Sequence, residues 1–329
     1  MPDLIPPAEL AGYQQRSNAL LAGLDAILFG QQDLTRLVLT GMLAGGHVLL
    51  EGLPGLGKTE LVKALARLAG LDHKRIQFTP DLLPADITGT LILQETAGGR
   101  NLVFRAGPLF AQVVLADEIN RASPKTQSAL LQAMQERCVT VFDTTHELPR
   151  PFFVLATQNP IEQDGTYPLP EAQLDRFTIK ATVTGISADA LTRILMERPD
   201  GRPAPPAAVC DQDGIAVLLA AVARIVLPEA VAGYIARLVN ATRPELAGSP
   251  GAVKTAVRWG ASPRAAIALA GCARAKALLS GRPAVGFADV QVLAVPVIAH
   301  RLVLTYEAGL AGTSAAQIVE GLVREIPEV

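Results

Sequence analysis

Residues 49–59 read Leu-Leu-Glu-Gly-Leu-Pro-Gly-Leu-Gly-Lys-Thr, and this stretch decides the fold. Gly52, Gly57, Lys58 and Thr59 fit the spacing G-x-x-x-x-G-K-[ST] of a phosphate-binding loop. Glycines let the backbone curl so that several N–H groups point inward at a polyphosphate, and the N-terminus of a following helix adds its partial positive charge. A glycine-rich turn that binds nothing is the alternative interpretation of these residues.

The residues on either side supply the structural context that the motif needs. The apolar run from Val48 to Leu50 is typical of a buried strand, and residues 60–68 carry apolar side chains at helical spacing. Strand, loop and helix in this order disfavour the non-binding turn. We therefore expect Lys58 to reach the β- and γ-phosphates of a nucleotide and the Thr59 hydroxyl to ligate Mg²⁺. The predicted nucleotide contacts in the loop are Gly52, Leu53, Pro54, Gly55, Leu56, Gly57, Lys58 and Thr59.

Length and composition predict a globular protein of two domains. The chain has 329 residues, more than a single core usually supports, and half of its residues are apolar. Its formal net charge of −2 lacks the basic excess that nucleic-acid-binding proteins usually show. This lowers the expectation of a DNA or RNA partner, although a local basic groove is compatible with a balanced total.

Cysteine usage and hydropathy predict a cytoplasmic protein that does not insert into a membrane. Cys138, Cys210 and Cys272 are far apart and odd in number, so we expect buried thiols in a reducing compartment, with neither a zinc site nor a disulfide framework. The N-terminus has acidic residues and prolines where a signal peptide would need a basic start and an apolar run. The most apolar stretch, residues 214–223, is too short to span a bilayer.

Strands alternate with helices over the first half of the chain, which predicts an α/β fold with a mostly parallel sheet flanked by helices. Residues 17–45 have the pattern of two helices with a break at Gly30-Gln31. Two β-hairpins are predicted as inserts, one from stretches 89–94 and 101–105 and one from 138–142 and 146–149 around the turn 143–145. The other predicted strands are 75–78, 112–116 and 152–157, and the helix 125–136 begins after the capping pair Ser123-Pro124.

The pattern changes after about residue 185. Residues 199–206 are rich in Pro, Gly and Ala, and beyond them nearly every periodic stretch is helical. We predict an α/β nucleotide-binding domain with an N-terminal helical segment over residues 1–185 and a helical domain over residues 186–329. The helices expected in the second domain are 214–224, 228–243, 263–279, 287–301 and 313–325.

Asp117 and Glu118 follow an apolar strand, so in a parallel sheet they lie at the same edge as the phosphate loop. Asp117 can hold Mg²⁺ beside Thr59, directly or through a water. Glu118 can polarise a water in line with the γ-phosphate. The alternative is a solvated acidic turn, and a phosphate loop at the same edge of the sheet disfavours that interpretation.

Three further polar residues are candidates on weaker grounds. Asn159 ends the strand next to Asp117 and can donate to a γ-phosphate oxygen and hold the attacking water, but an Asn before Pro is also an ordinary turn starter. Arg176 offers a permanent planar cation for a phosphoryl group, or is a surface partner of Asp175. Arg264 follows Ser262-Pro263 at a predicted helix start that could face an anion, or is exposed to water.

Together these residues resemble the MoxR family of AAA+ ATPases, in the group with an insert in the second helix. The resemblance extends from about residue 26 to residue 325. It implies Asn159 as the sensor-1 residue, Arg176 as an arginine finger that reaches a neighbour's nucleotide, and Arg264 as the sensor-2 arginine. Whether Arg264 acts within or between subunits is left open, because the helical lid can be displaced in relatives. Within residues 27–31, Gly30 and Gln31 would lie near the adenine. The motifs that carry the resemblance are residues 27–31, the phosphate loop, and residues 77–89, 107–110, 116–121, 130–136, 156–160, 169–177 and 260–265.

The resemblance implies ATP and Mg²⁺ as cofactors and a homo-oligomer, expected as a hexameric ring with nucleotide between neighbours. It also implies a protein client that is remodelled or matured, often with a partner that contains a von Willebrand factor A domain, and the two hairpins would face the pore or surface of the ring. A DNA-handling motor is the alternative, since relatives with the same insert include helicases, but neutral charge and the lack of a zinc module disfavour it. A nucleotide-gated binding module is a third possibility, disfavoured by Glu118, Asn159 and Arg176 together.

Overall fold

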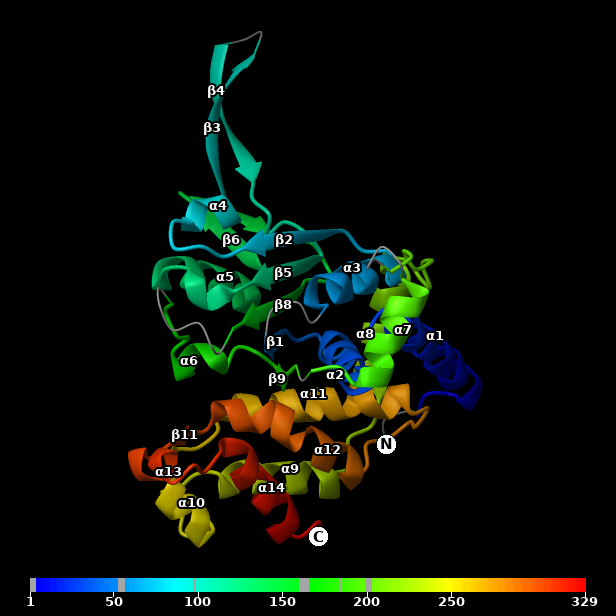
Figure 1. Ribbon diagram of the computed structural model, residues 1–329, viewed down its shortest axis with the longest axis vertical. Helices are drawn as coiled ribbons and strands as arrows, with labels where there is room; N and C mark the ends of the chain where they lie inside the picture. The colour runs from blue at the N-terminus through cyan, green and yellow to red at the C-terminus, as the bar shows by residue number, and fades with distance from the viewer. Residues whose placement is uncertain (1–3, 53–56, 97–98, 160–165, 184, 199–202) are drawn as a thin grey trace.

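The computed structural model describes residues 4–52, 57–96, 99–159, 166–183, 185–198 and 203–329. Its centre is a five-stranded sheet in the order β2-β5-β8-β1-β9, in which every neighbouring pair is parallel. Parallel strands need crossover connections, and the helices between them supply these (Figure 1). The strands are β1 (Val48–Glu51), β2 (His73–Gln77), β5 (Val113–Asp117), β8 (Phe153–Gln158) and β9 (Ile179–Thr182).

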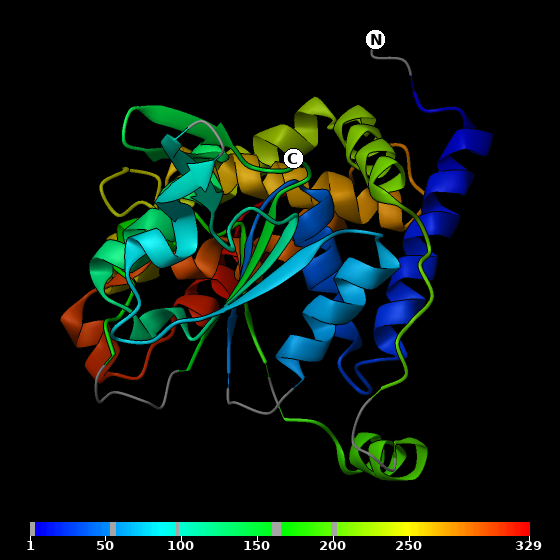
Figure 2. The ribbon, with the colours of Figure 1, turned by 90° about the horizontal axis from the view of Figure 1, so that it is seen from above.

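The central strands are buried on both faces, and alternate side chains enter two different cores. In β5, Val113 and Leu115 belong to the core on the side of α3 (Lys58–Leu68), which contacts β5, and α2 (Gln32–Leu43) covers β1 and β9 on the same side. Val114 and Ala116 face the opposite way and pack with α5 (Pro124–Glu136). Viewed from above, α3 and α5 accordingly lie on opposite sides of the sheet (Figure 2).

The core on the α2 and α3 side continues without interruption into the C-terminal helices. It includes α1 (Pro7–Asp25), and α11 (Pro263–Leu279) contacts α1, α2, α8, α9 and α12. Apolar packing between the two halves therefore fixes the helical part against the sheet, while the division at residue 185 stays a prediction. The other C-terminal helices are α7 (Ala188–Glu197), α8 (Gln212–Arg224), α9 (Glu229–Ala241), α10 (Gly251–Ala256), α12 (Phe287–Ile298), α13 (Tyr306–Leu310) and α14 (Ala315–Glu325).

Both predicted hairpins are present, with a corrected turn in the second. β3 (Gly89–Thr96) and β4 (Gly99–Ala106) form a ribbon that projects from the body (Figure 1). In the other hairpin, β6 (Cys138–Val141) pairs with β7 (Thr144–Glu147) in the register Val141↔Thr144. The turn is thus Phe142-Asp143 and not residues 143–145, and Phe142 has the positive φ of 52° that two-residue hairpin turns favour.

Several predicted boundaries were wrong. The first helix begins at Pro7 and ends at Asp25, so Ile27 and Leu28 lie beyond it, although both are buried. The predicted helix 287–301 ends at Ile298 and continues as the 3-10 turn η2 (Ala299–Arg301). β9, α7 and the small sheet of β10 (Val257–Trp259) and β11 (Val303–Leu304) have no counterpart among the elements predicted from the sequence. The remaining short elements are α4 (Pro84–Thr88), η1 (Ile119–Arg121) and α6 (Glu171–Leu174).

The three cysteines are free thiols, and the prediction that they are buried holds fully only for Cys272. Burial raises the pKa of Cys272 to about 12, whereas Cys138 and Cys210 are partly exposed. Across the described ranges, no helix combines the length and apolar character that crossing a membrane requires.

Candidate functional site

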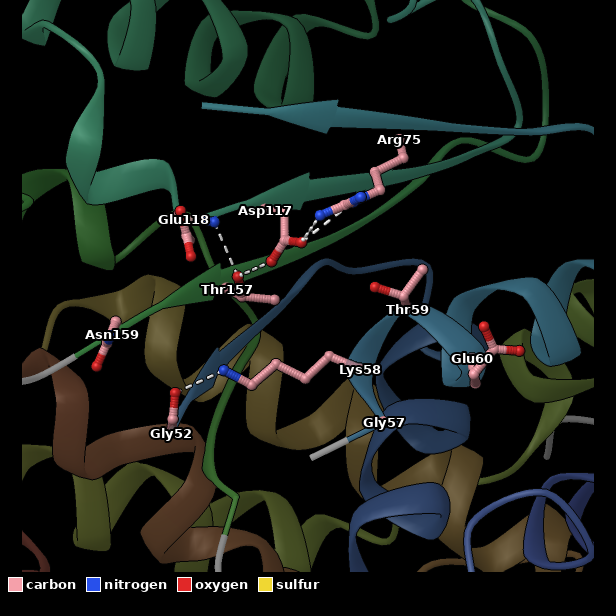
Figure 3. Close-up of a pocket in the computed structure, with 10 residues that line it drawn as sticks. All are labelled: Gly52, Gly57, Lys58, Thr59, Glu60, Arg75, Asp117, Glu118, Thr157 and Asn159. Atoms are coloured by element: carbon pink, nitrogen blue, oxygen red, sulfur yellow. Dashed lines mark hydrogen bonds and ion pairs between the residues drawn. The ribbon is translucent and has the colours of Figure 1, made fainter. Parts of the chain in front are cut away.

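The phosphate loop joins β1 to α3 at the carboxyl edge of the sheet (Figure 3). Gly52 follows β1 directly, and Gly57 is the N-cap of α3 with a φ of 80°, which an L side chain rarely adopts. A Cβ there would also lie 2.9 Å from Leu28 Cδ2, so glycine suits this position. The predicted contacts Leu53, Pro54, Gly55 and Leu56 lie outside the described residues.

Lys58 and Thr59 open α3, where the partial positive charge of the helix N-terminus favours an anion. Lys58 Nζ donates to the Gly52 carbonyl at 2.6 Å, so the ammonium group lies beside the residue that follows β1 (Figure 3). Burial lowers the pKa of Lys58, and the carboxylates Asp117 and Glu118 oppose that shift. The ammonium group of Lys58 therefore contacts the Gly52 carbonyl and also interacts electrostatically with the carboxylates of Asp117 and Glu118.

Asp117 and Glu118 lie at the end of β5, as predicted, and Thr157 of β8 holds both. Thr157 Oγ1 donates to Asp117 Oδ1 at 2.6 Å and accepts from the Glu118 N–H at 2.9 Å. Glu118 has a φ of 57°, a left-handed conformation that turns the chain sharply after the strand. A side chain of the neighbouring strand therefore fixes the Asp117 carboxylate and the backbone of Glu118.

Two residues of β2 that the sequence analysis missed also contact these carboxylates. Arg75 Nη2 lies 2.8 Å from Asp117 Oδ2, and Gln77 Nε2 donates to Glu118 Oε2 at 2.7 Å. Gln77 and Asp117 are register partners of the parallel pair β2 and β5. The sequence offered only the polar character of β2, in which Ile76 is the one apolar residue, and this does not reveal which strand lies beside β2.

Asn159 joins the same group of residues. It is 8% exposed, follows β8, and accepts a hydrogen bond at its carbonyl from Asn120 Nδ2 at 3.3 Å. It borders a cavity of about 240 Å³ together with Lys58, Thr59 and the strand-end carboxylates. The structure thus brings Asn159, Asp117, Glu118 and the described loop residues to one cavity (Figure 3).

Arg176 and Arg264 lie elsewhere. Both border a separate pocket of about 450 Å³, which Arg137 and Arg301 also line. Ser262 is the N-cap of α11, as predicted, and Arg264 Nη1 lies 3.7 Å from Asp175 Oδ2. Neither arginine is among the residues that line the phosphate-loop cavity. The two predicted cations are therefore close to each other and apart from the loop.

Gly30 and Gln31 border a third cavity, of about 860 Å³, between the start of α2, β9 and the helices α12 and α14. Glu51 lines this cavity and the next residue, Gly52, lines the phosphate-loop cavity. The cavity at Gly30 and Gln31 and the phosphate-loop cavity are therefore lined by two consecutive residues, Glu51 and Gly52. Gly30 has a φ of 73°, and a Cβ there would lie 2.9 Å from Ala190 Cβ of α7.

The residues of the first cavity fit a nucleotide with Mg²⁺. Mg²⁺ is usually held by one or two carboxylates, phosphate oxygens and waters, not by a cage of protein ligands. Asp117 and the Thr59 hydroxyl offer such a partial set of oxygens, and Lys58 offers a cation for the phosphates. Among the described residues, no three His, Cys, Asp or Glu side chains gather into a complete metal site.

Comparisons with known proteins identify the family. Residues 47–179 match the ATPase family associated with various cellular activities (AAA), and residues 251–322 match the AAA lid domain. Bacillus subtilis YeaC is 43% identical over 95% of both chains. Chaperone MoxR1 of Mycobacterium tuberculosis is 45% identical over 89% of this chain and 77% of its own length. The crystal structure of a candidate ATPase from Cytophaga hutchinsonii is 38% identical, with a TM-score of 0.89 over 97% of this chain and 96% of that one.

The fold agrees with these matches. A parallel sheet carries the phosphate loop and the strand-end Asp-Glu pair, and a helical domain packs against it. Identity to a MoxR chaperone extends through both parts, over 294 residues. The chain therefore belongs to the MoxR family of AAA+ ATPases.

Proposed function

We propose that the protein hydrolyses ATP with Mg²⁺ at the phosphate-loop cavity. Lys58 binds the β- and γ-phosphates, and Thr59 and Asp117 hold the metal ion, which neutralises charge on the phosphates when bound. Glu118 polarises the attacking water and Asn159 orients it. Gly30 and Gln31 bind adenine in the adjoining cavity. The shared cavity of Lys58, Asp117, Glu118 and Asn159 supports these roles.

We further propose that catalysis requires a neighbouring copy of the chain. One observation carries this proposal: Arg176 and Arg264 border a pocket of their own, separate from the cavity at the phosphate loop. An arginine that stabilises the transferring phosphoryl group accelerates hydrolysis by about 10³–10⁵-fold. A protomer whose arginines face away from its own nucleotide would supply them to the next protomer, so the assembly is a ring, which we expect to be hexameric.

The assignment of the cavity residues is tested with three variants. Lys58→Ala removes the phosphate cation and should abolish nucleotide binding, whereas Glu118→Gln should bind ATP and lose hydrolysis. Lys63→Ala is the matched control, because Lys63 lies on the same helix but is exposed and pairs only with Glu60 among the ion pairs described. Binding of a fluorescent ATP analogue and phosphate release are measured. Equal loss of binding in Lys58→Ala and Glu118→Gln would show that Glu118 is misassigned.

Supply of the arginine by a neighbour is tested with mixed assemblies. Arg176→Ala should lower turnover by roughly 10³-fold or more without lowering ATP affinity. Mixing Arg176→Ala with Glu118→Gln should restore turnover, because a Glu118→Gln subunit still provides an intact Arg176 to its neighbour. Differently tagged subunits that co-purify establish that mixed assemblies form. Mixed assemblies without recovered turnover would contradict the proposal.

We propose that turnover remodels or matures a protein client, since a relative 45% identical is named a chaperone. A separate protein with a von Willebrand factor A domain is the expected partner. The Glu118→Gln variant should retain the client in the presence of ATP, because its assembly binds nucleotide without releasing it as product. Lys58→Ala is the control for that capture. A client or partner recovered equally with both variants would not depend on nucleotide and would contradict this part of the proposal.

A further inference from the structure

Arg301 is a buried arginine in η2 whose hydrogen bonds surround the loop that carries Arg176. Its side chain is 3% exposed, although arginine is almost never fully buried unless it is paired. Its Nε donates to Asp175 Oδ1 at 2.7 Å, and its Nη2 donates to the Phe177 carbonyl at 2.7 Å. Weaker contacts reach the carbonyls of Asp175 at 3.3 Å and Thr178 at 3.4 Å. The guanidinium thus contacts the residues on both sides of Arg176.

Arg301 is also anchored in the helical domain, since its Nη1 donates to the Val297 carbonyl of α12. The adjacent His300 Nε2 donates to the same Phe177 carbonyl at 3.0 Å. Burial and the charge of Arg301 lower the pKa of His300 to about 3, so its ring is neutral at pH 7. Two side chains of η2, which follows α12, therefore donate to the Phe177 carbonyl.

Asp175 connects the same loop to a second helix of the helical domain. Its carboxylate accepts from Arg301 at 2.7 Å and from Ser262 Oγ at 3.0 Å, and Arg264 Nη1 lies 3.7 Å away. Ser262 is the N-cap of α11 and Arg264 is its second residue. The residue before Arg176 is therefore fixed to both α11 and η2, and the pocket lined by Arg176 and Arg264 lies beside this junction.

We infer that Arg301, through Asp175, is a positioning residue that couples the orientation of the helical domain to the Arg176 side chain supplied to the neighbouring protomer. This inference rests on the proposed function. A buried ion pair is weak evidence for stability, because desolvation of the two charges offsets much of their attraction. The hydrogen bonds of Arg301 fix the backbone on both sides of Arg176, so we assign them the role of positioning Arg176 and not only of stabilising the fold. Movement of the helical domain would displace Arg176 from the neighbour's nucleotide.

Substitution of Arg301 by lysine replaces the forked guanidinium with a single ammonium group and keeps the positive charge. Arg301→Lys can keep an ion pair with Asp175 but cannot reach the surrounding carbonyls at the same time. We expect kcat to fall by roughly 10- to 100-fold, the cost of misplacing a catalytic group by about 1 Å. The KM for ATP should change by less than about threefold, since Arg301 does not line the phosphate-loop cavity.

Arg282→Lys is the matched control, because Arg282 makes a similar forked pair with buried Asp289 in the helical domain, at 2.7 and 2.5 Å. That pair involves α12 at its N-terminus and does not contact the Arg176 loop among the hydrogen bonds described. Arg282→Lys should keep kcat within about twofold of the unmodified protein. An equal loss of kcat in both variants would assign Arg301 to general stability and overturn the inference.

Mixed assemblies separate a defective arginine supply from a defective nucleotide site. Arg301→Lys mixed with Glu118→Gln should recover turnover, because the Glu118→Gln subunit provides a correctly placed Arg176. Arg301→Lys mixed with Arg176→Ala should not recover, because neither subunit provides one. Recovery in the second mixture and not in the first would place the defect in the nucleotide site and overturn the inference.

The mixture of Arg176→Ala with Glu118→Gln is run beside these two. Its failure would refute supply by a neighbour, whereas its success with the opposite result for Arg301→Lys would refute the positioning role alone. If Arg301→Lys loses the cooperative unfolding transition, Asp175→Asn, which keeps the shape of the side chain, is put through the same mixtures. Loss of folding in both variants would assign the pair to stability and overturn the inference.

Discussion

The Thr157 hydroxyl connects the Asp117 carboxylate to the backbone N–H of Glu118. Thr157 is 1% exposed, and its hydroxyl both donates to the Asp117 carboxylate and accepts from the Glu118 N–H. Because the hydroxyl fixes the carboxylate and the backbone after it together, its loss should displace the proposed metal ligand and the proposed base at once. A valine has nearly the same shape and lacks the hydroxyl.

We therefore predict that Thr157→Val lowers kcat by roughly 10- to 100-fold. It leaves the Glu118 N–H without this acceptor, which costs about 1–3 kcal/mol of stability if the group stays buried. Thr157→Ser keeps the hydroxyl and should retain most of the activity. Steady-state kinetics and urea denaturation of both variants measure the two effects. A Thr157→Val protein with unchanged kcat would show that the hydroxyl does not position the carboxylates.

His47 gives the fold a predictable dependence on pH. Its Nδ1 accepts from the Val154 N–H at 3.0 Å and its Nε2 donates to the Met134 carbonyl at 3.1 Å, so the ring is neutral. Burial lowers the pKa of His47 to about 4. The unfolded chain binds the proton more readily, at its ordinary pKa of about 6.5. This contribution to stability is therefore complete above about pH 6.5 and is lost progressively as the pH falls toward 4.

We predict that the free energy of unfolding falls between pH 6.5 and pH 4 by up to about 1.4 kcal/mol per pH unit for each such histidine. His300, with a pKa lowered to about 3, contributes in the same direction. His47→Gln should remove about half of the slope due to these two rings, whereas His73→Gln, at an exposed position of β2, should leave it unchanged. Urea denaturation at each pH measures the slope. An identical slope for His47→Gln would contradict the assignment.

At the scale of elements, the β3–β4 hairpin and the central strand β5 place apolar residues in opposite environments. Leu93 and Leu102 are register partners in the hairpin and are 58% and 66% exposed. Leu115 of β5 is 1% exposed and packs in the core with α3. Leucines in these two places are therefore expected to contribute very differently to stability, and the projecting hairpin leaves apolar side chains exposed.

We predict that Leu102→Ala changes the free energy of unfolding by less than about 0.5 kcal/mol. The same substitution at Leu115 should cost about 2–5 kcal/mol, because it removes buried methyl groups and leaves a cavity. Chemical denaturation of the two variants compares them directly. A large loss of stability in Leu102→Ala would mean that the hairpin is covered in solution, which an assembled ring would explain and dilution would reverse.

Elements that depend on local sequence were predictable, and elements created by pairing were not. The phosphate loop, β5 and α5 have strong local patterns, and Ser123 accepts from the Thr126 N–H at 3.4 Å as the N-cap of α5. By contrast β9 has only 4 residues and becomes a strand by pairing with β1. The apolar side chains of α7 were no guide to a core, since Leu195 and Met196 are 69% and 78% exposed.

At the scale of the whole molecule, the cavity with the phosphate loop and the pocket with Arg176 are separate. If each copy completes the site of another, activity depends on assembly and not only on the fold of one chain. We predict that ATP turnover per subunit rises with protein concentration until assembly is complete, and that Arg176→Ala removes this rise. Phosphate release and sedimentation velocity over the same concentrations measure both properties. A strictly monomeric protein with full activity would refute this picture.

The sequence by itself determined the phosphate-loop motif, the strand-end pair Asp117-Glu118 and the alternation of strands and helices in the first half of the chain, because these depend on short-range spacing and local backbone preference. Only the tertiary structure decided that Arg75 and Gln77 contact that pair, since the contacts follow from the strand order β2-β5-β8-β1-β9. The tertiary structure also decided that Arg301, 125 positions beyond Arg176 in the chain (301 − 176), holds the Arg176 loop. Such contacts come from packing between distant segments, which local spacing does not encode.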